Sequence, residues 1–383
     1  MRKLKGKLFV FTILLFMIYP VLGRFLDKEI QLSGVTNTSE LSDFNIQNVM
    51  DGSYQTSFNN WWDENFPGRS LLINIRGQLL YTFLNQSSNT NVTIEKDKYL
   101  FSPGYITTEL GANRIEDEML LQDLGQKLIS LEKILKENGK ELYIFMTPNK
   151  AHFCSDKISW KFNLLKSDDE NNYNMFKKLL EKTDLKYFDS REYIENYNGE
   201  KIDAPIFYPT GIHWSSSWGM HAAIAFEEYI NENSKWELSE LECKESPCNE
   251  PQWPDADLYQ SLNIISQPKQ QYYTASISIK KEKDKPNVFI RGGSFLGQSL
   301  NGIISAGVFK KDVHLENTYY FTNRYSKKKD LSSYTSYDEM NLDKMLGETD
   351  ILILEVNENS LDAMGFGFIE YVLEHPEYFN NNE

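Results

Sequence analysis

A serine that follows two glycines, and a histidine upstream of it, are the side chains whose types could do chemistry together. The apolar run 288–290 leads into Gly292-Gly293-Ser294. This pattern predicts a buried strand that ends in a tight turn and exposes the Ser294 hydroxyl. A nucleophile needs such a rigid support, with backbone N–H groups nearby, here those of Gly293 and Ser294, to receive a developing oxyanion. Gly-Gly-Ser also occurs in ordinary turns, so the motif needs support from elsewhere.

That support comes from the segment Tyr208-Pro209-Thr210-Gly211-Ile212-His213-Trp214. An esterase or acyltransferase needs a base that takes the nucleophile's proton and usually an acid that orients the base. His213 can be the base for Ser294. The acid often lies a residue or two from the histidine, but Gly211 and Ile212 occupy those positions. Asp203 and, farther back, Asp189 remain alternatives between which spacing does not choose.

The composition excludes several classes of protein. A formal net charge of −15 over 383 residues argues against nucleic acid as a partner. The chain is 40% hydrophobic and 14% aromatic, enough for a sizeable core, although aromatic residues also suit a carbohydrate-facing cleft. The five histidines show no metal-ligand spacing and no Cys-x-x-Cys pair exists, so we expect no metal and no cofactor.

The N-terminus carries a targeting signal. Four basic residues among the first seven precede an apolar run from Leu8 to Leu22. Residues 1–26 are therefore predicted to be a signal peptide or an N-terminal membrane anchor, with cleavage near Gly23 left open. Positive charge on the N-terminal side keeps that end inside and exports the rest. We expect a membrane-attached protein with an exported C-terminal domain, or a secreted one.

The three cysteines fit an oxidising compartment. Cys243 and Cys248 flank four residues and are predicted to close a small disulfide loop. Cys154 is left over, either as a buried thiol or as a nucleophile.

Helical and strand patterns alternate along most of the chain. Leucines at helical spacing predict a helix over 115–138, and Gly139 ends it. The apolar segment 141–146 predicts a strand closed by Thr147-Pro148. We expect an α/β fold with a central, mainly parallel sheet, in which loops after the strands hold the ligands. Further expected elements are helices 173–180 and 214–233 and strands 186–188, 288–291 and 351–357, which place Asn149, Lys150, Asp189 and Ser294 on one rim.

The remaining segments set the expected domain boundaries. Residues 27–60 are predicted to be an irregular lead-in, and 61–375 the main domain, which begins with an amphipathic helix over 71–84. A hairpin is expected with its turn at Lys96-Asp97. Residues 235–285 are expected to form an inserted, irregular or β segment, and 376–383 a disordered tail.

Six short stretches follow one another along the chain: 66–69 (Phe-Pro-Gly-Arg), 98–101, 147–150 (Thr-Pro-Asn-Lys), 208–214, 292–295 and 355–357. In this order they resemble the SGNH-hydrolase-like domain of the alginate O-acetyltransferases and their Gram-positive relatives. The resemblance covers about residues 50–360, and it implies a three-layer sandwich that acetylates an exopolysaccharide. It also implies a membrane-bound O-acyltransferase as the partner that supplies the acetyl group.

The resemblance assigns roles to individual residues. Ser294 matches the catalytic serine and His213 the catalytic histidine, while Asn149, Lys150, Arg69, Tyr208 and Trp214 fall at site or binding positions. Lys150 could instead be a solvated loop lysine, and Arg69 could pair with Asp63 or Glu64. Two positions depart from the family: Gly211 and Gly293 stand where it usually carries aspartates. Loss of a triad acid costs on the order of 10⁴ in turnover and leaves some catalysis.

Two functions therefore stay open. The first is an extracytoplasmic O-acetyltransferase or acetylesterase that acts on a polysaccharide through an acyl-serine. The second is a degenerate relative that binds polysaccharide, or serves as a scaffold, without turnover. The sequence identifies neither the polysaccharide nor the acyl donor.

Overall fold

The computed structural model describes residues 2–26, 30–34, 39–115, 118–266, 268–316, 321–325, 328–334 and 337–380. Two compact units make up the chain: Met1–Ile94 with Asp257–Lys269, and Glu95–Ala256 with Gln270–Glu383. The second unit therefore begins at Glu95, later than the predicted domain start at residue 61. Residues 381–383 of the expected tail lie outside the described residues, and 376–379 form a 3₁₀ turn.

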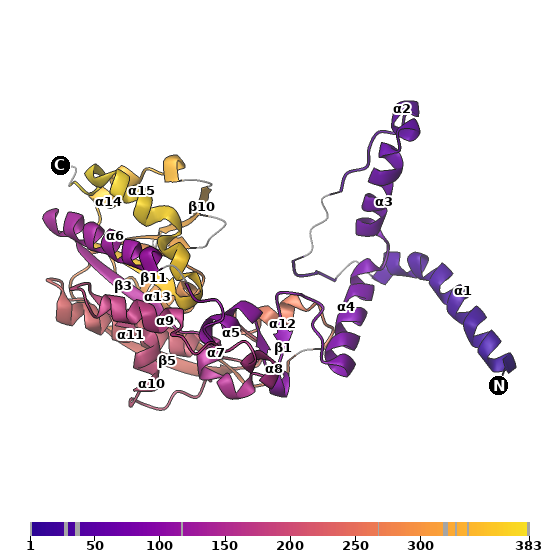
Figure 1. Ribbon diagram of the computed structural model, residues 1–383, viewed down its shortest axis with the longest axis horizontal. Helices are drawn as coiled ribbons and strands as arrows, with labels where there is room; N and C mark the ends of the chain where they lie inside the picture. Colours follow the sequence, from indigo (N-terminus) through magenta and orange to yellow (C-terminus); the bar gives the residue numbers. More distant parts are fainter. Residues whose placement is uncertain are drawn as a thin grey trace. The chain divides into compact units, whose positions relative to one another are not determined.

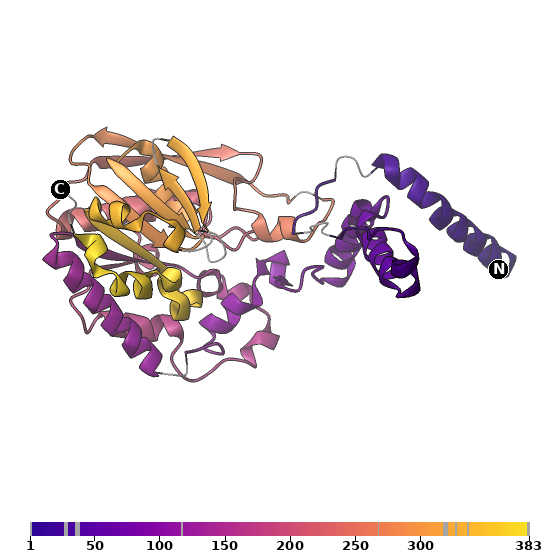
Figure 2. The same cartoon turned by 90° about the horizontal axis from the view of Figure 1, so that it is seen from above.

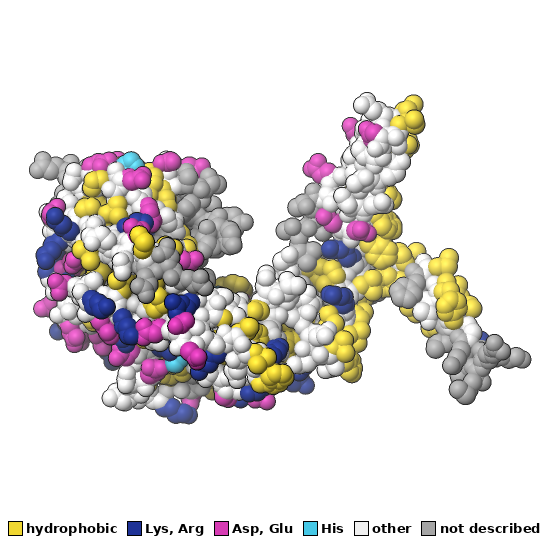
Figure 3. Space-filling view, viewed as in Figure 1, with side chains coloured by type: hydrophobic (Ala, Val, Ile, Leu, Met, Phe, Trp, Pro, Cys, Tyr) yellow, Lys and Arg dark blue, Asp and Glu magenta, His cyan; other side chains and the backbone are white. Residues whose placement is uncertain are grey.

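The first unit is mostly helical. Its α4 continues as a single π-helical segment over Leu80–Leu84, which agrees with the amphipathic helix expected over 71–84. Hydrophobic side chains gather on the exposed faces of α1 and α4 (Figure 3). None of the helices in the described ranges combines the length and the hydropathy that a membrane crossing requires. The elements are α1 (Arg2–Leu26), α2 (Ile46–Met50), α3 (Ser53–Asn65), α4 (Arg69–Leu79), β1 (Thr93–Ile94) and α12 (Asp257–Ser261).

The lead-in predicted to be irregular over 27–60 contains helix α2 and most of α3, so that prediction is wrong for residues 46–60. Asn45 caps α2 because its side chain accepts the backbone N–H of Asn48 at 2.8 Å. Along α3, Phe58 lies against Trp61 and Trp62 at helical spacing, with ring centroids 6.3 and 6.2 Å apart. Contacts between residues at i, i+3 and i, i+4 stabilise a helix. The polar composition of this segment gave no sign of them.

The second unit is built on a seven-stranded sheet with the order β10-β9-β8-β7-β11-β3-β4 (Figure 1). The five strands from β8 to β4 run parallel, and β9 and β10 extend the sheet in antiparallel fashion. The predicted mainly parallel sheet is therefore confirmed. The strands are β3 (Glu141–Thr147), β4 (Tyr187–Asp189), β7 (Asn287–Gly292), β8 (Lys311–Glu316), β9 (Phe321–Tyr325), β10 (Lys328–Tyr334) and β11 (Ile351–Asn357).

Helices cover both faces of this sheet and make three layers (Figures 1 and 2). Alternate residues of β3 and β11 point to opposite faces, so Leu142 and Leu352 enter one core while Tyr143 and Ile353 enter the other. The first core is closed by α6 (Glu118–Glu137), α9 (Asn172–Leu180), α14 (Leu342–Gly347) and α15 (Phe368–Glu374). The second is closed by α10 (Ser190–Glu195), α11 (Ser216–Asn233) and α13 (Leu296–Ala306).

The predicted insertion contains an antiparallel ribbon of β5 (Glu240–Cys248) and β6 (Tyr272–Lys281). Cys243 and Cys248 lie on the same extended strand, and both are free thiols. Five residues of strand span about 16 Å, whereas a disulfide needs Cα atoms within about 7 Å. The predicted Cys243–Cys248 disulfide is therefore wrong, since the two residues form a strand rather than a loop.

The shorter elements of the second unit connect the sheet to its helices. The turn expected at Lys96-Asp97 is present, and within it the Tyr99 N–H donates to the Lys96 carbonyl at 3.1 Å. The remaining elements are η3 (Lys96–Lys98), β2 (Leu100–Phe101), α5 (Pro103–Glu109), α7 (Lys150–Phe153), η4 (Ser155–Lys157), α8 (Trp160–Asn163), η5 (Tyr337–Glu339), η6 (Glu358–Gly367) and η7 (Pro376–Phe379).

Candidate active site

Ser294 and His213 meet at the end of strand β7. Ser294 lies in the turn between β7 and α13 and is exposed, and His213 is buried. The His213 Nε2 atom lies 2.8 Å from Ser294 Oγ, at hydrogen-bonding distance. The ring of Phe295 packs against the imidazole, with centroids 4.7 Å apart. This arrangement gives an exposed hydroxyl whose proton an adjacent imidazole can accept.

The neighbouring tryptophan holds the histidine loop against the serine turn. Trp214 is fully buried, and its indole N–H donates to the Phe295 carbonyl at 3.1 Å. Tyr208 is also buried, and its hydroxyl accepts the backbone N–H of Tyr273 at 2.9 Å. Burial raises the pKa of Tyr208. The expected binding roles of Tyr208 and Trp214 are therefore wrong, because both side chains belong to the protein interior.

A glutamate that sequence reasoning did not select lies under the serine turn. One carboxylate oxygen of Glu355, on β11, accepts the Gly293 N–H at 2.6 Å, and the other accepts the Thr147 hydroxyl at 2.5 Å. The Gly293 N–H is thus occupied and does not point at an oxyanion, contrary to the expected role. A Cβ on Gly293 would lie 3.4 Å from this carboxylate. An aspartate at position 293 would place a second negative charge beside Glu355, and the two carboxylates would repel each other. This repulsion explains why glycine is suited to position 293.

Gly292 is needed for close approach. A Cβ at this position would lie 2.5 Å from the Glu355 Cβ and 2.7 Å from a methyl group of Leu296. Only glycine lets β7 approach β11 closely enough for the carboxylate to reach the turn.

Neither acid predicted to orient His213 bonds to it. Asp189 caps α10, where it accepts the Arg191 N–H at 3.0 Å and the Tyr173 hydroxyl at 2.6 Å. It ends β4, three strands from β7, which is about 14 Å across the sheet. Asp203 pairs with Lys201 at 2.5 Å, and its side chain is half exposed. Both predicted acids are engaged elsewhere, because each has local partners.

Backbone atoms fill the space that a side chain at position 211 would need, where the resemblance expects an aspartate. A Cβ on Gly211 would lie 2.8 Å from the Asp255 carbonyl oxygen and 2.9 Å from that of Pro254. The hydroxyl of Thr210 donates to the same Asp255 oxygen at 2.8 Å. The histidine loop therefore packs directly on the 254–255 backbone and has no room for a side chain at Gly211.

Lys150 is fully buried behind the histidine loop rather than facing a ligand. Its ammonium donates to the carbonyl oxygens of Leu100, Tyr208, Pro209 and Gly211, at 2.8, 2.8, 3.2 and 2.6 Å. Three of these acceptors belong to the loop that carries His213. The expectations of a site-lining lysine and of a solvated one are both wrong, since the charge is satisfied by main-chain oxygens.

Asn149 likewise has a structural position. Its side chain caps α7 by accepting the Ala151 N–H at 2.8 Å, and its amide donates to the Tyr105 carbonyl at 3.0 Å. Asn149 therefore fixes α5 and α7 near the site and is not placed as an oxyanion donor. Arg69 lies in the first unit, where it lines a hollow with Trp62, Asp63 and Phe66.

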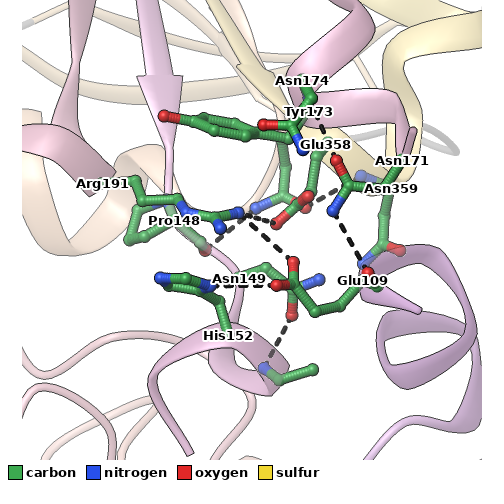
Figure 4. A network of polar contacts seen from close by, with 12 residues as sticks. Glu109, Pro148, Asn149, His152, Asn171, Tyr173, Asn174, Arg191, Glu358 and Asn359 are labelled. Atoms are coloured by element: carbon green, nitrogen blue, oxygen red, sulfur yellow. Dashed lines mark hydrogen bonds and ion pairs between the residues drawn. The ribbon is translucent and has the colours of Figure 1, made fainter. Parts of the chain in front are cut away.

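A second polar cluster, unpredicted from the sequence, lies at the carboxyl edge of β3, β4 and β11 (Figure 4). His152 contacts Glu109 at 2.9 Å and Glu195 at 2.6 Å, and Arg191 contacts Glu109 at 3.3 Å. Burial would lower the pKa of His152, but the two carboxylates outweigh it and raise that pKa. Burial, reinforced by the charge of Glu109, raises the pKa of Glu358. The only sequence signal was that several of these residues follow strands.

The SGNH hydrolase-like domain of the acetyltransferase AlgX matches residues 92–292, more than half of the chain. This chain belongs to that family. The match confirms the resemblance inferred from the ordered motifs, and with it the SGNH-like fold. No curated protein is similar in sequence.

Three solved structures of other proteins are similar to this chain at low sequence identity. The O-acetyltransferase domain of Pseudomonas putida AlgJ is 12% identical and covers 74% of this chain and 98% of its own, with a TM-score of 0.43. Pseudomonas aeruginosa AlgX is 14% identical and covers 73% and 67%, with a TM-score of 0.46. Bacillus cereus PatB1, with a sulfonyl adduct, is 12% identical and covers 70% and 97%, with a TM-score of 0.46.

Proposed function

We propose that this SGNH-like domain transfers acetyl groups to hydroxyls of a polysaccharide outside the cytoplasm, through an acyl-enzyme on Ser294. The observation that carries the proposal is the 2.8 Å approach of His213 Nε2 to the exposed Ser294 Oγ. Family membership supports acetyl as the transferred group.

The first half-reaction loads the serine. His213 takes the Ser294 proton while Oγ attacks the acetyl carbonyl, and a tetrahedral oxyanion forms. The backbone N–H of Ser294 is the donor we assign to that oxyanion, because Glu355 occupies the N–H of Gly293. When the oxyanion collapses, the donor's oxygen leaves with the proton from His213, and acetyl-Ser294 remains.

The second half-reaction unloads it. A sugar hydroxyl gives its proton to His213 and attacks the acetyl carbon, and the serine leaves and recovers its proton. Water in place of the sugar gives acetylesterase activity by the same route. The basic and apolar N-terminal segment supports export with a membrane attachment, and a membrane-bound O-acyltransferase is the partner we assign as acetyl donor.

The test uses the full-length chain, p-nitrophenyl acetate as donor and a mixture of oligosaccharides as acceptor. Wild type should form acetyl-Ser294, detected by peptide mass spectrometry, and should acetylate the acceptor. Ser294→Ala should abolish both, and His213→Ala should lower the rate of acetylation of Ser294 by about 10³-fold or more. Equal rates in wild type and Ser294→Ala would remove Ser294 from the reaction.

A second candidate is polysaccharide binding without turnover. It is favoured by the engagement of the Gly293 N–H with Glu355, which leaves one fewer donor for an oxyanion, and by glycine at position 211. Stable binding of glycan by wild type, unchanged in His213→Ala and with no acetyl-Ser294, would establish this function instead.

A further inference from the structure

A pocket of about 630 Å³ lies in the second unit, and Tyr105 of α5 forms part of its wall. It is bounded by α5, the loop 110–115, the start of α9 and the first turns of η6. Its volume falls within the roughly 300–1,000 Å³ typical of small-molecule sites. The residues that matter for its chemistry are Tyr105, Asn113, Arg114, Asn172 and Asp362.

One stacked pair of rings connects this pocket to the candidate active site. Tyr105 lines the pocket and stacks on Phe295, with centroids 6.0 Å apart and an interplanar angle of 19°. Phe295 follows Ser294 directly and packs against His213. The pocket also includes Asn359, two residues after the end of β11, so it lies at the same carboxyl edge of the sheet. The Tyr105–Phe295 ring pair therefore connects the pocket wall to the residue that follows Ser294.

The pocket wall is held rigidly. The Asn172 amide accepts the Ile115 N–H at 2.8 Å and donates to the Asn113 carbonyl at 3.1 Å. The Asn113 side chain in turn donates to the Thr107 hydroxyl at 2.6 Å. These bonds tie residues 113 and 115 to α5 and α9, so a ligand that binds there loses little free energy in ordering this part of the wall.

The lining chemistry suits a neutral, hydroxyl-rich ring. Arg114 is the lining cation, and its guanidinium is already paired with Asp169 at 2.9 Å. Asp362 is the lining anion, so the pocket has no excess of positive charge for an acidic sugar. The net charge of −15 for the whole chain adds repulsion against polyanions. Hydroxyls can still bond the remaining guanidinium N–H groups, the carboxylate and the Asn113 amide, and a sugar face can rest near Tyr105.

We propose that this pocket, lined by Tyr105, Asn113, Arg114 and Asp362, binds a neutral sugar unit of the acceptor polysaccharide next to Ser294. The assignment of this pocket as an acceptor site rests on the proposed acetyl transfer. Binding of the sugar itself is independent of the chemistry at Ser294.

The experiment measures binding alone, by calorimetry on the full-length Ser294→Ala protein, with cellotetraose, chitotetraose and tetragalacturonate as probes. At least one neutral tetrasaccharide should bind, and tetragalacturonate should bind at least about tenfold more weakly. Arg114→Ala and Asp362→Ala, each in the same background, should weaken neutral binding by about tenfold, the effect of one lost hydrogen bond to a charged group.

Lys133→Ala on α6 and Asp184→Ala are matched controls, because both residues are exposed and neither lines the pocket. Both should bind like the parent. Hydrogen exchange with bound glycan should show protection over 105–115 and 359–362, which locates the ligand even if a variant folds poorly. No binding of either neutral probe, tighter binding of tetragalacturonate, or equal weakening in the controls would overturn the proposal. Binding without any acetyl-Ser294 in the active protein would refute the acetyl transfer and leave the sugar site intact.

Discussion

The Glu355 carboxylate accepts the backbone N–H of Gly293 at 2.6 Å, one residue before Ser294. Its other oxygen is bonded to Thr147, so this buried carboxylate joins the ends of β7, β11 and β3. The acid that supports the serine turn therefore comes from the neighbouring strand rather than from the position before the serine.

Replacement of Glu355 by alanine should loosen that turn. We expect Glu355→Ala to lower the rate of Ser294 acetylation by about 10²-fold, the effect of a small misplacement of a reacting group. Glu355→Gln keeps an oxygen that can accept the Gly293 N–H, and it should recover much of the rate. Glu374→Gln, an exposed site on α15, is the control for loss of charge. Equal rates for the alanine and glutamine variants would show that the hydrogen bond does not position the serine.

Removal of the Lys150 ammonium should destabilise the histidine loop. Lys150→Met leaves four carbonyl oxygens without their shared donor, and it should lower the free energy of unfolding by about 3 kcal/mol or more. Urea denaturation measures this change, with the exposed Lys133→Met as the matched control. A difference below about 0.5 kcal/mol would contradict the inferred role.

Replacement of Gly211 by the aspartate that the family usually carries should lower stability without raising the rate of acetylation. Gly211→Asp and Gly211→Ala both add a Cβ within 3 Å of the 254–255 backbone, so each should lower the melting temperature by several degrees. Neither should raise the rate of Ser294 acetylation. A gain in rate for the aspartate without loss of stability would mean that the loop can move aside.

Glu227 should make stability depend on pH. This side chain on α11 is 2% exposed, and burial raises its pKa to about 8 from an ordinary value near 4.5. The raised pKa means that its contribution is fully present below about pH 4.5 and is lost as pH rises through about 8. Glu227→Gln should therefore be more stable than wild type above pH 8, by roughly 3–5 kcal/mol, and the difference should shrink toward pH 5. Chemical denaturation at several pH values measures it, and a gap that does not change with pH would refute this account.

The three cysteines should react as free thiols. Burial raises the pKa of Cys243 to about 11, so it should react slowly with a thiol reagent at neutral pH until the protein unfolds. In denaturant without reductant, reagent labelling should find three thiols per chain. Labelling of only Cys154 would restore the disulfide between Cys243 and Cys248.

Local patterns in the sequence were enough to predict the helices and strands that support the site. Leucine spacing located α6, and the apolar run at 351–357 gave β11 with both ends correct. The meeting of Ser294 and His213 followed from their motifs, because each lies at the end of an element that the pattern defined.

The roles of Lys150 and Glu355 could not be predicted in the same way. Each acts on partners 50 or more positions away in the chain, and no local period reports such a contact. Spacing identified Lys150 as part of a motif but could not tell a lysine that faces a ligand from one that holds three carbonyls of a loop. Glu355 looked like the polar end of a strand, and only the sheet order places it beside Gly293.

The sheet order also determines at what stage of synthesis the candidate site can form. Among the described residues β11 is the last strand, yet it lies between β7 and β3. A chain that is synthesised from its N-terminus contains His213 and Ser294 before the strand that carries Glu355 has been made. The turn that carries Ser294 thus gains its contact with Glu355 only late in synthesis, and a product truncated before residue 351 contains Ser294 and His213 without that contact.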